Sequence, residues 1–168
     1  MRPHLSPPPF DPSLAEVWMR VALREAESAF HENEVPVGCL IINQAGSIVG
    51  HGRDDRQKKA DPFAHAEVIA IRRAAEALGD WRLDGHTLVV TLEPCPMCAG
   101  LILMSRIGRV IYGAKNLKWG ASSTKIDLLE GRHFPHKPEV IGGILEMECS
   151  QILSGYFEAR RSINSPDR

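Results

Sequence analysis

The amino-acid sequence predicts an α/β fold in which a sheet lies between layers of helices. Apolar stretches with strand-like and helical periodicity alternate along the chain, which is typical of such layered folds. The 168 residues, of which 43% are apolar, suit one domain with a sizeable core. No apolar run reaches the roughly 18 residues that a membrane span needs.

The first half of the chain contains clear helix and turn signals. Asp11 followed by Pro12 is typical of a helix N-terminus, and apolar residues then recur at helical spacing. Two apolar segments around Gly46 indicate a hairpin, and Gly79 ends a second helical pattern. We therefore expect a helix over 12–32, strands over 35–42 and 47–52 joined by a turn at 43–46, a polar loop over 53–62 and a helix over 64–78.

The second half continues the alternation of strands and helices. The short run Thr87–Thr91 is apolar and predicts a strand buried on both faces. Pro94 begins the next helical stretch, and Gly113 follows another apolar run. We expect strands over 87–91, 109–113 and 139–141, helices over 94–104 and 144–156, and a loop over 113–123.

The two ends of the chain differ in composition from its middle. Residues 1–11 are rich in proline and lack the apolar stretch of a signal peptide, so they predict a flexible tail. The expected division is this tail, one folded domain over 12–161 and a flexible C-terminal tail over 162–168. A cytoplasmic location is the default expectation.

Four cysteines are present, at positions 39, 95, 98 and 149. An even number allows two disulfides, although a chain of this length without a secretion signal does not need them. Cys95 and Cys98 form a C-x-x-C pair, which in an intracellular protein indicates metal or redox chemistry. Cys39 and Cys149 are expected to be buried as small apolar side chains.

The strongest chemical signal combines His65-Ala66-Glu67 with Pro94-Cys95-Pro96-Met97-Cys98, each at the start of a predicted helix. One imidazole and two thiolates are suitable zinc ligands, and three protein ligands leave a fourth position for water, as in a catalytic site. The helix dipole favours the two thiolates. Zinc lowers the pKa of a bound water to about 7. Glu67, two residues from His65, is placed to move protons without binding the metal.

Two other interpretations of these residues explain them less well. A structural zinc site would leave Glu67 incidental, and a thioredoxin-like redox pair would explain neither His65 nor Glu67. The combination H-x-E followed by P-C-x-x-C is the known signature of zinc deaminases, which favours the catalytic interpretation.

With these motifs and their flanks, residues 16–160 resemble the tRNA-specific adenosine deaminase family of the cytidine deaminase-like superfamily. The flanking segments are more specific to the tRNA enzymes than the metal motif is. The matching segments are 34–38, 61–62, 64–67, 81–83, 91–100, 105–107, 112–114 and 143–145.

The resemblance implies a three-layer α/β/α sandwich with a five-stranded mixed sheet, and a homodimer. It implies hydrolysis of adenosine to inosine at the wobble position (34) in the anticodon stem-loop of a tRNA, with one Zn²⁺ per subunit. By carry-over, His65, Cys95 and Cys98 bind zinc and Glu67 is catalytic. The expected substrate-binding residues are Val37, Asp54, Ala66, Pro94 and Asn116.

The sequence departs from the family pattern at two places. An Asn is usual eleven residues before the zinc-binding histidine, where this chain has Asp54; Asn116 and Trp119 are unusual in the loop after Gly113. An ionised carboxylate only accepts hydrogen bonds. Asp54 therefore has three possible roles: pairing with Arg53 or Arg56 away from substrate, mimicking Asn when protonated, or accepting from a different base.

Charge distribution bears on the substrate. The net charge is −1, but residues 100–140 carry seven basic and three acidic side chains. Such a segment is either a solvated face or a patch that binds phosphates.

The alternative to a tRNA enzyme is a deaminase of a free nucleobase or small nucleoside, such as guanine or cytosine, on the same fold. A silent RNA-binding subunit is disfavoured because Glu67 is present. The basic residues from Arg106 to Lys137, with Arg160 and Arg161, are expected to include those that contact RNA.

Overall fold

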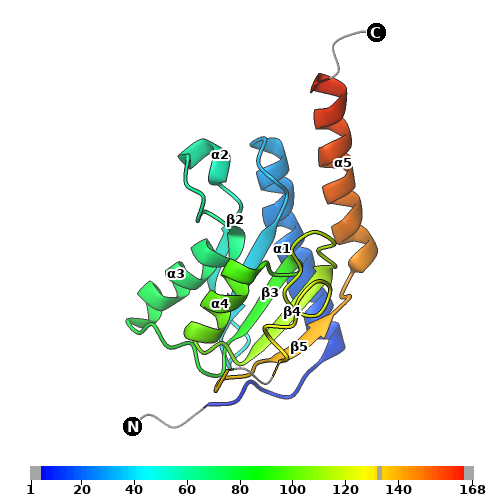
Figure 1. Cartoon of the computed structure of the whole chain (residues 1–168). Coiled ribbons are helices and arrows are strands. Elements are labelled where there is room, and N and C mark those ends of the chain that lie inside the picture. The colour runs from blue at the N-terminus through cyan, green and yellow to red at the C-terminus, as the bar shows by residue number, and fades with distance from the viewer. Residues whose placement is uncertain (1–4, 132–133, 165–168) are drawn as a thin grey trace.

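A computed structural model describes residues 5–131 and 134–164 and contains five strands and five helices in that part of the chain (Figure 1). The elements are α1 (Pro12–His31), β1 (Gly38–Ile42), β2 (Ile48–Arg53), α2 (Arg56–Lys59), α3 (Ala66–Leu78), β3 (Thr87–Leu92), α4 (Pro96–Met104), β4 (Arg109–Ala114), β5 (Glu139–Gly142) and α5 (Glu146–Asn164).

The five strands form one mixed sheet in the order β2-β1-β3-β4-β5. The β1–β2 hairpin is antiparallel, as is the β1–β3 pair, whereas β3, β4 and β5 run parallel to one another. β3 lies at the centre and is buried on both faces, as its apolar sequence predicted. The carboxyl ends of β3 and β4 therefore meet at one edge of the sheet.

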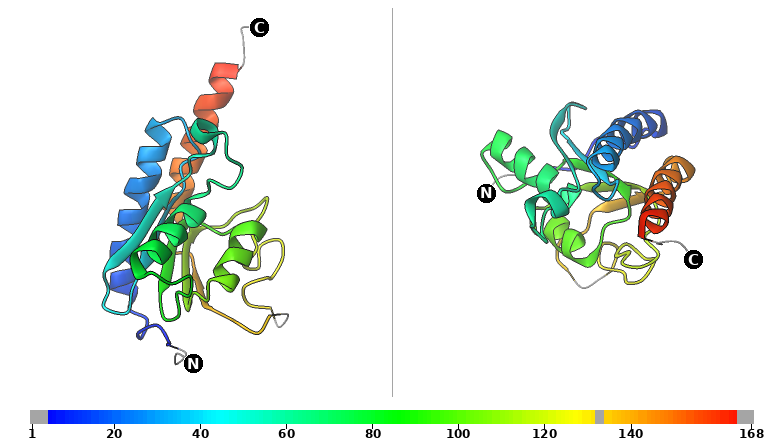
Figure 2. Two further views of the ribbon diagram at one scale, coloured as in Figure 1. Left: turned by 90° about the vertical axis from the view of Figure 1, so that its left-hand side faces the viewer. Right: turned by 90° about the horizontal axis from the view of Figure 1, so that it is seen from above.

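Helices cover both faces of the sheet and complete three layers. α3 and α4 pack on one face, where their apolar residues join those of β1, β3 and β4 in a single core. α1 and α5 pack on the other face over Leu40, Val89 and Ile111. Figure 2 shows the two layers on either side of the sheet. The predicted α/β/α sandwich with a five-stranded mixed sheet is confirmed.

Two local features explain how the helices sit. Asp11 is the N-cap of α1, and its side chain accepts hydrogen bonds from the backbone amides of Ser13 (2.9 Å) and Leu14 (3.4 Å). Gly52 lets α3 approach β2 closely, because a Cβ there would lie 2.6 Å from the carbonyl oxygen of Ala66. This contact fixes the start of α3 against the sheet.

The structure differs from the sequence prediction in three segments. The first strand begins at Gly38 instead of residue 35, and the polar loop contains the short helix α2. α5 continues to Asn164 instead of ending near Tyr156, and its last turns project beyond the sheet (Figure 1). The domain boundaries remain a prediction, although part of the proline-rich segment touches the fold: the Arg109 side chain donates a hydrogen bond to the carbonyl of Pro8 (2.7 Å).

Within the described residues, no helix is both long and apolar enough to cross a membrane.

Candidate active site

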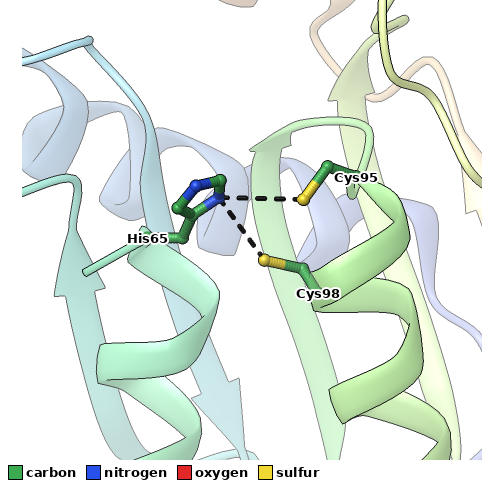
Figure 3. A group of neighbouring side chains, drawn as sticks. All are labelled: His65, Cys95 and Cys98. Carbon is green, nitrogen blue, oxygen red and sulfur yellow. Dashed lines mark hydrogen bonds between the residues drawn. The ribbon is translucent and has the colours of Figure 1, made fainter. Parts of the chain in front are cut away.

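The predicted metal ligands come from the starts of two helices on the same face of the sheet. His65 is the N-cap residue of α3, and Cys95 is the N-cap residue of α4 with Pro96 in the first turn. Both caps have extended backbone conformations and neither side chain caps its own helix. The side chains of His65, Cys95 and, one turn into α4, Cys98 are therefore free to point toward one another, as Figure 3 shows.

The distances among these three residues fit a zinc ion. The Nδ1 atom of His65 lies 3.8 Å from the Sγ atom of Cys95 and 3.6 Å from that of Cys98. A tetrahedral zinc with bonds of about 2.3 Å to sulfur and about 2.05 Å to nitrogen holds sulfur and nitrogen roughly 3.6 Å apart. Among the described residues, these three form the metal-capable group, with all ligand atoms within 4.8 Å of one another. The donor set and its spacing fit zinc.

The electrostatic environment of the two thiols agrees with this assignment. Hydrogen bonds from Cys98 and His65 outweigh the effect of burial and together lower the pKa of Cys95 to about 4. The hydrogen bond between Cys95 and Cys98 and burial raise the pKa of Cys98 far above its ordinary value. The hydrogen bond with Cys95 also raises the pKa of His65. A bound zinc ion would hold both sulfur atoms as thiolates.

Glu67 lies in the first turn of α3, beside the metal-capable group. Its side chain is buried, and burial raises its pKa to about 7. Cys95 and His65 are close enough to act on the charge of this carboxyl, and the thiol of Cys98 is a hydrogen-bond partner. A carboxyl with this pKa exchanges protons readily at neutral pH.

A cavity of about 480 Å³ opens above this group. Of the predicted site residues, Val37, Asp54, His65, Glu67, Cys95 and Asn116 line it. Ala66, Pro94 and Cys98 lie outside its lining: Ala66 and Cys98 are fully buried, and the carbonyl of Pro94 accepts a hydrogen bond from the amide of Ala121 (2.9 Å). The volume is in the range of small-molecule sites.

Asp54 pairs with Arg56 at the edge of this cavity. The Nε atom of Arg56 donates to both carboxylate oxygens, at 3.1 and 2.9 Å, and the Arg56 amide donates at 3.3 Å. Burial raises the pKa of Asp54, whereas Arg56 acts in the opposite direction. Of the two arginines expected as partners of Asp54, Arg56 is therefore the one that pairs with it. Arg53 instead pairs with Glu25 and Glu32.

The cavity wall also contains residues that the sequence did not single out, namely Val35, Leu92, Glu93, Leu117, Leu153 and Phe157. Four more were named for other reasons: Arg56 as a partner of Asp54, Lys115 and Lys118 within the basic segment, and Trp119 as unusual. Leu153 and Phe157 come from α5, which is close to the site only after folding. Glu93 carried a usable signal, because an acid at the end of a fully apolar strand needs buried hydrogen-bond donors.

The basic segment 100–140 does not form one patch. Arg109 is buried and pairs with Glu139 (2.7 Å) at the amino ends of β4 and β5, opposite the cavity. Lys137 lies in the same region, beside Pro7–Pro9. Lys115 and Lys118 line the cavity, and Arg132 lies outside the described residues. Arg109 is therefore not available to an RNA phosphate, because its charge serves an internal ion pair.

Comparisons with known proteins point to one family. A family model for the cytidine and deoxycytidylate deaminase zinc-binding region matches residues 12–114. A tRNA-specific adenosine deaminase of Bacillus subtilis (strain 168) is 45% identical over 147 residues, covering 87% of this chain and 90% of the relative. The enzyme of the same name from Haemophilus influenzae is 44% identical, covering 87% and 84%.

A solved structure from studies of A-to-I editing by tRNA:A34 deaminases at the wobble position is similar with a TM-score of 0.78. It is 40% identical in sequence, and the match covers 82% of this chain and 99% of that chain.

Proposed function

This chain belongs to the tRNA-specific adenosine deaminases, within the family of zinc-binding cytidine and deoxycytidylate deaminases, and from this premise we propose that it hydrolyses adenosine to inosine at the wobble position of a tRNA. The observation that carries the proposal is the buried carboxyl of Glu67 beside a three-residue zinc site, next to a cavity of about 480 Å³.

The proposed reaction replaces an amino group by oxygen. Water adds to the ring carbon that bears the amino group, the bond to that nitrogen breaks, and ammonia leaves. Zinc held by His65, Cys95 and Cys98 would supply Lewis-acid activation of the water. Glu67 takes a proton from the attacking water and delivers protons to the ring nitrogen and the leaving amine.

The remaining cavity residues hold the base. Val37 supplies an apolar wall and Asn116 also lines the cavity, whereas Ala66 and Pro94 lie outside the lining. Asp54, held by Arg56, lies at the edge and tunes substrate choice without taking part in the chemistry. The Asp54→Asn variant tests this role through the ratio of rates on tRNA and on free guanine or cytosine. An unchanged ratio removes Asp54 from specificity.

A basic groove next to the cavity suits the anticodon stem-loop. The groove has a volume of about 740 Å³. Lys118, Leu153 and Phe157 line both the groove and the active-site cavity, and Arg160 and Arg161 line the groove. Phosphates bound there would release counterions, so binding should weaken steeply as salt rises. A single-stranded loop also lets the target base leave its stack at low cost. If the substrate is a tRNA, we expect the protein to act in the cytoplasm.

We also propose a homodimer, supported by the outer face of α4. Met97, Gly100, Leu101 and Met104 recur at helical spacing along this face, and the Met104 side chain is 74% exposed. A monomer rarely leaves a continuous apolar stripe in water, and a second copy of this chain would cover it.

One experiment separates the candidate activities. The purified protein is incubated with a tRNA that carries A34 and, separately, with free guanine and cytosine, while ammonia and inosine are measured. Inosine formed in the tRNA, without ammonia released from the free bases, supports the proposal. Ammonia from a free base, without inosine in tRNA, would make the free-base deaminase the function instead.

A further inference from the structure

The rim of the active-site cavity carries two exposed apolar side chains. Leu117 is 72% exposed and Trp119 is 65% exposed, and both line the cavity from the segment between β4 and the Ser122–Asp127 bridge. Among the described residues, Trp119 stacks on no other aromatic ring. A large aromatic group left in water beside a binding cavity indicates a surface that contacts a ligand.

This segment is held in place by a buried carboxylate. Glu93, 1% exposed, accepts hydrogen bonds from the amides of Asn116 (3.1 Å), Ser122 (3.0 Å) and Thr124 (3.2 Å), and also from the Thr124 hydroxyl. A Cβ at Gly120 would lie 2.4 Å from the Glu93 carboxylate, so the chain passes directly over it. Glu93 thus fixes both ends of the segment.

The backbone of Trp119 is fixed as well. The Asn116 side-chain oxygen accepts hydrogen bonds from the amides of Lys118 (3.2 Å) and Trp119 (3.0 Å). The Asn116 amide nitrogen in turn donates to the carbonyl of Glu93 (3.4 Å). An exposed indole on a fixed backbone loses little conformational freedom when a flat ligand stacks on it.

The charges around this surface identify the ligand class. Lys115 and Lys118 alternate with Leu117 and Trp119 along the segment, and Arg161 lines the adjoining groove. Aromatic faces interleaved with cations are the means by which proteins bind single-stranded nucleic acid, with bases stacked and phosphates paired. A free nucleobase brings no phosphate and, inside the cavity, has no need of the outer rim.

We propose that Leu117 and Trp119 form a stacking platform for the base next to the target adenosine in single-stranded RNA. The proposal rests on the proposed function, because it deepens the definition of the RNA substrate of the same cavity. The platform recognises a flat ring and not a hydrogen-bonding edge, so it tolerates different neighbouring bases.

Kinetics on an anticodon stem-loop RNA test the platform. Trp119→Ala should raise KM for the RNA about tenfold with little change in kcat, because base stacking on an aromatic residue is worth about five- to a hundredfold in affinity. Trp119→Phe should retain most of the affinity. Trp81→Ala is the matched control, since Trp81 is equally exposed (61%) but lies outside the cavity lining.

The ligand side is tested with the same variants. Two RNAs are compared, one with an abasic site on the 5′ side of the target and one with an abasic site on the 3′ side. For the wild-type protein, one of these two RNAs should have a raised KM. The same abasic site should leave KM for Trp119→Ala unchanged. Tryptophan fluorescence gives a direct readout of stacking. In an inactive Glu67→Ala enzyme that also carries Trp18→Phe and Trp81→Phe, Trp119 is the one remaining tryptophan. Its fluorescence should be quenched when this protein binds the RNA.

Three results would overturn the platform. If wild-type enzyme forms inosine in the RNA and Trp119→Ala has the same KM, the platform is wrong and the proposed function stands. If Trp119→Ala converts a dimer to a monomer in sedimentation, the side chain belongs to an interface between copies. If the wild-type protein deaminates free bases but no RNA, both the platform and the proposed function fail.

Discussion

Glu67 and Cys98 lie next to each other, and single substitutions separate their roles. Glu67→Gln preserves shape but removes the carboxylate that moves protons. We expect zinc content and melting temperature to change little while kcat falls about 10²–10⁴-fold. Zinc analysis and inosine formation measure the two effects. More than a tenth of the wild-type rate in this variant would contradict the mechanism.

Cys98→Ala should remove the metal itself. The substitution leaves two of three protein ligands, and metal binding is coupled to folding, so both zinc content and thermal stability should fall. Cys149→Ala is the control, because Cys149 is equally buried but packs on Gly113, away from the metal-capable group. Full zinc content in Cys98→Ala would show that the ligand set is different.

The reactive residues were predictable because they follow short local spacings. His65 and Glu67 are two residues apart, Cys95 and Cys98 three, and each pair begins a helix, so the motif alone places the donors. The place of Arg56 in the cavity wall and the donors that Glu93 binds were not predictable, because both depend on contacts made in three dimensions. Glu93 binds amides 23 to 31 residues away, a pairing that no periodicity encodes.

At the scale of elements, long-range hydrogen bonds explain where the sequence prediction stopped short. α2 forms in a polar run because the buried Glu34 carboxylate accepts from the amides of Gln57 (3.1 Å) and Lys58 (2.6 Å). α5 extends past its last apolar repeat because the Tyr156 hydroxyl and Arg160 donate to the carbonyl of Asn33, at 3.1 and 3.2 Å. Neither contact is visible in a local pattern.

The segment 115–124 should depend on the charge of Glu93. In Glu93→Gln, an amide replaces one acceptor oxygen among several N–H donors, so we expect the free energy of unfolding to fall by about 2–3 kcal/mol. We also expect KM for the RNA to rise more than kcat falls, with zinc content retained. Denaturant unfolding and steady-state kinetics measure these effects. A fall in kcat alone would assign Glu93 to the chemistry instead.

The whole molecule was predictable at the level of its layers. Alternating strand and helix patterns, with a fully apolar central strand, were sufficient for the α/β class. The mixed sheet was implied only by the family resemblance, and the strand order was not predicted: β1 is antiparallel to β3 whereas β4 is parallel to it. Apolar periodicity does not distinguish these pairings, because β3 is buried on both faces in either case.

Assembly is the property of the whole molecule that the outer face of α4 allows us to predict. Met104→Lys places a charge on the apolar stripe and should shift a dimer toward monomer in sedimentation velocity. Met147→Lys is a matched control, since Met147 is 72% exposed at the start of α5, outside the stripe. Equal sedimentation of both variants and wild type would exclude this face as the dimer interface.

The floor and the rim of the cavity come from different parts of the chain. The metal-capable residues and Glu67 begin α3 and α4, whereas the rim is formed by residues near Arg56, by Leu117–Trp119 and by α5. Directed evolution can therefore randomise the rim while every reactive atom stays in place. Libraries confined to those three segments should yield active enzymes with new substrate preferences, whereas libraries that include the two helix starts should yield mostly inactive proteins.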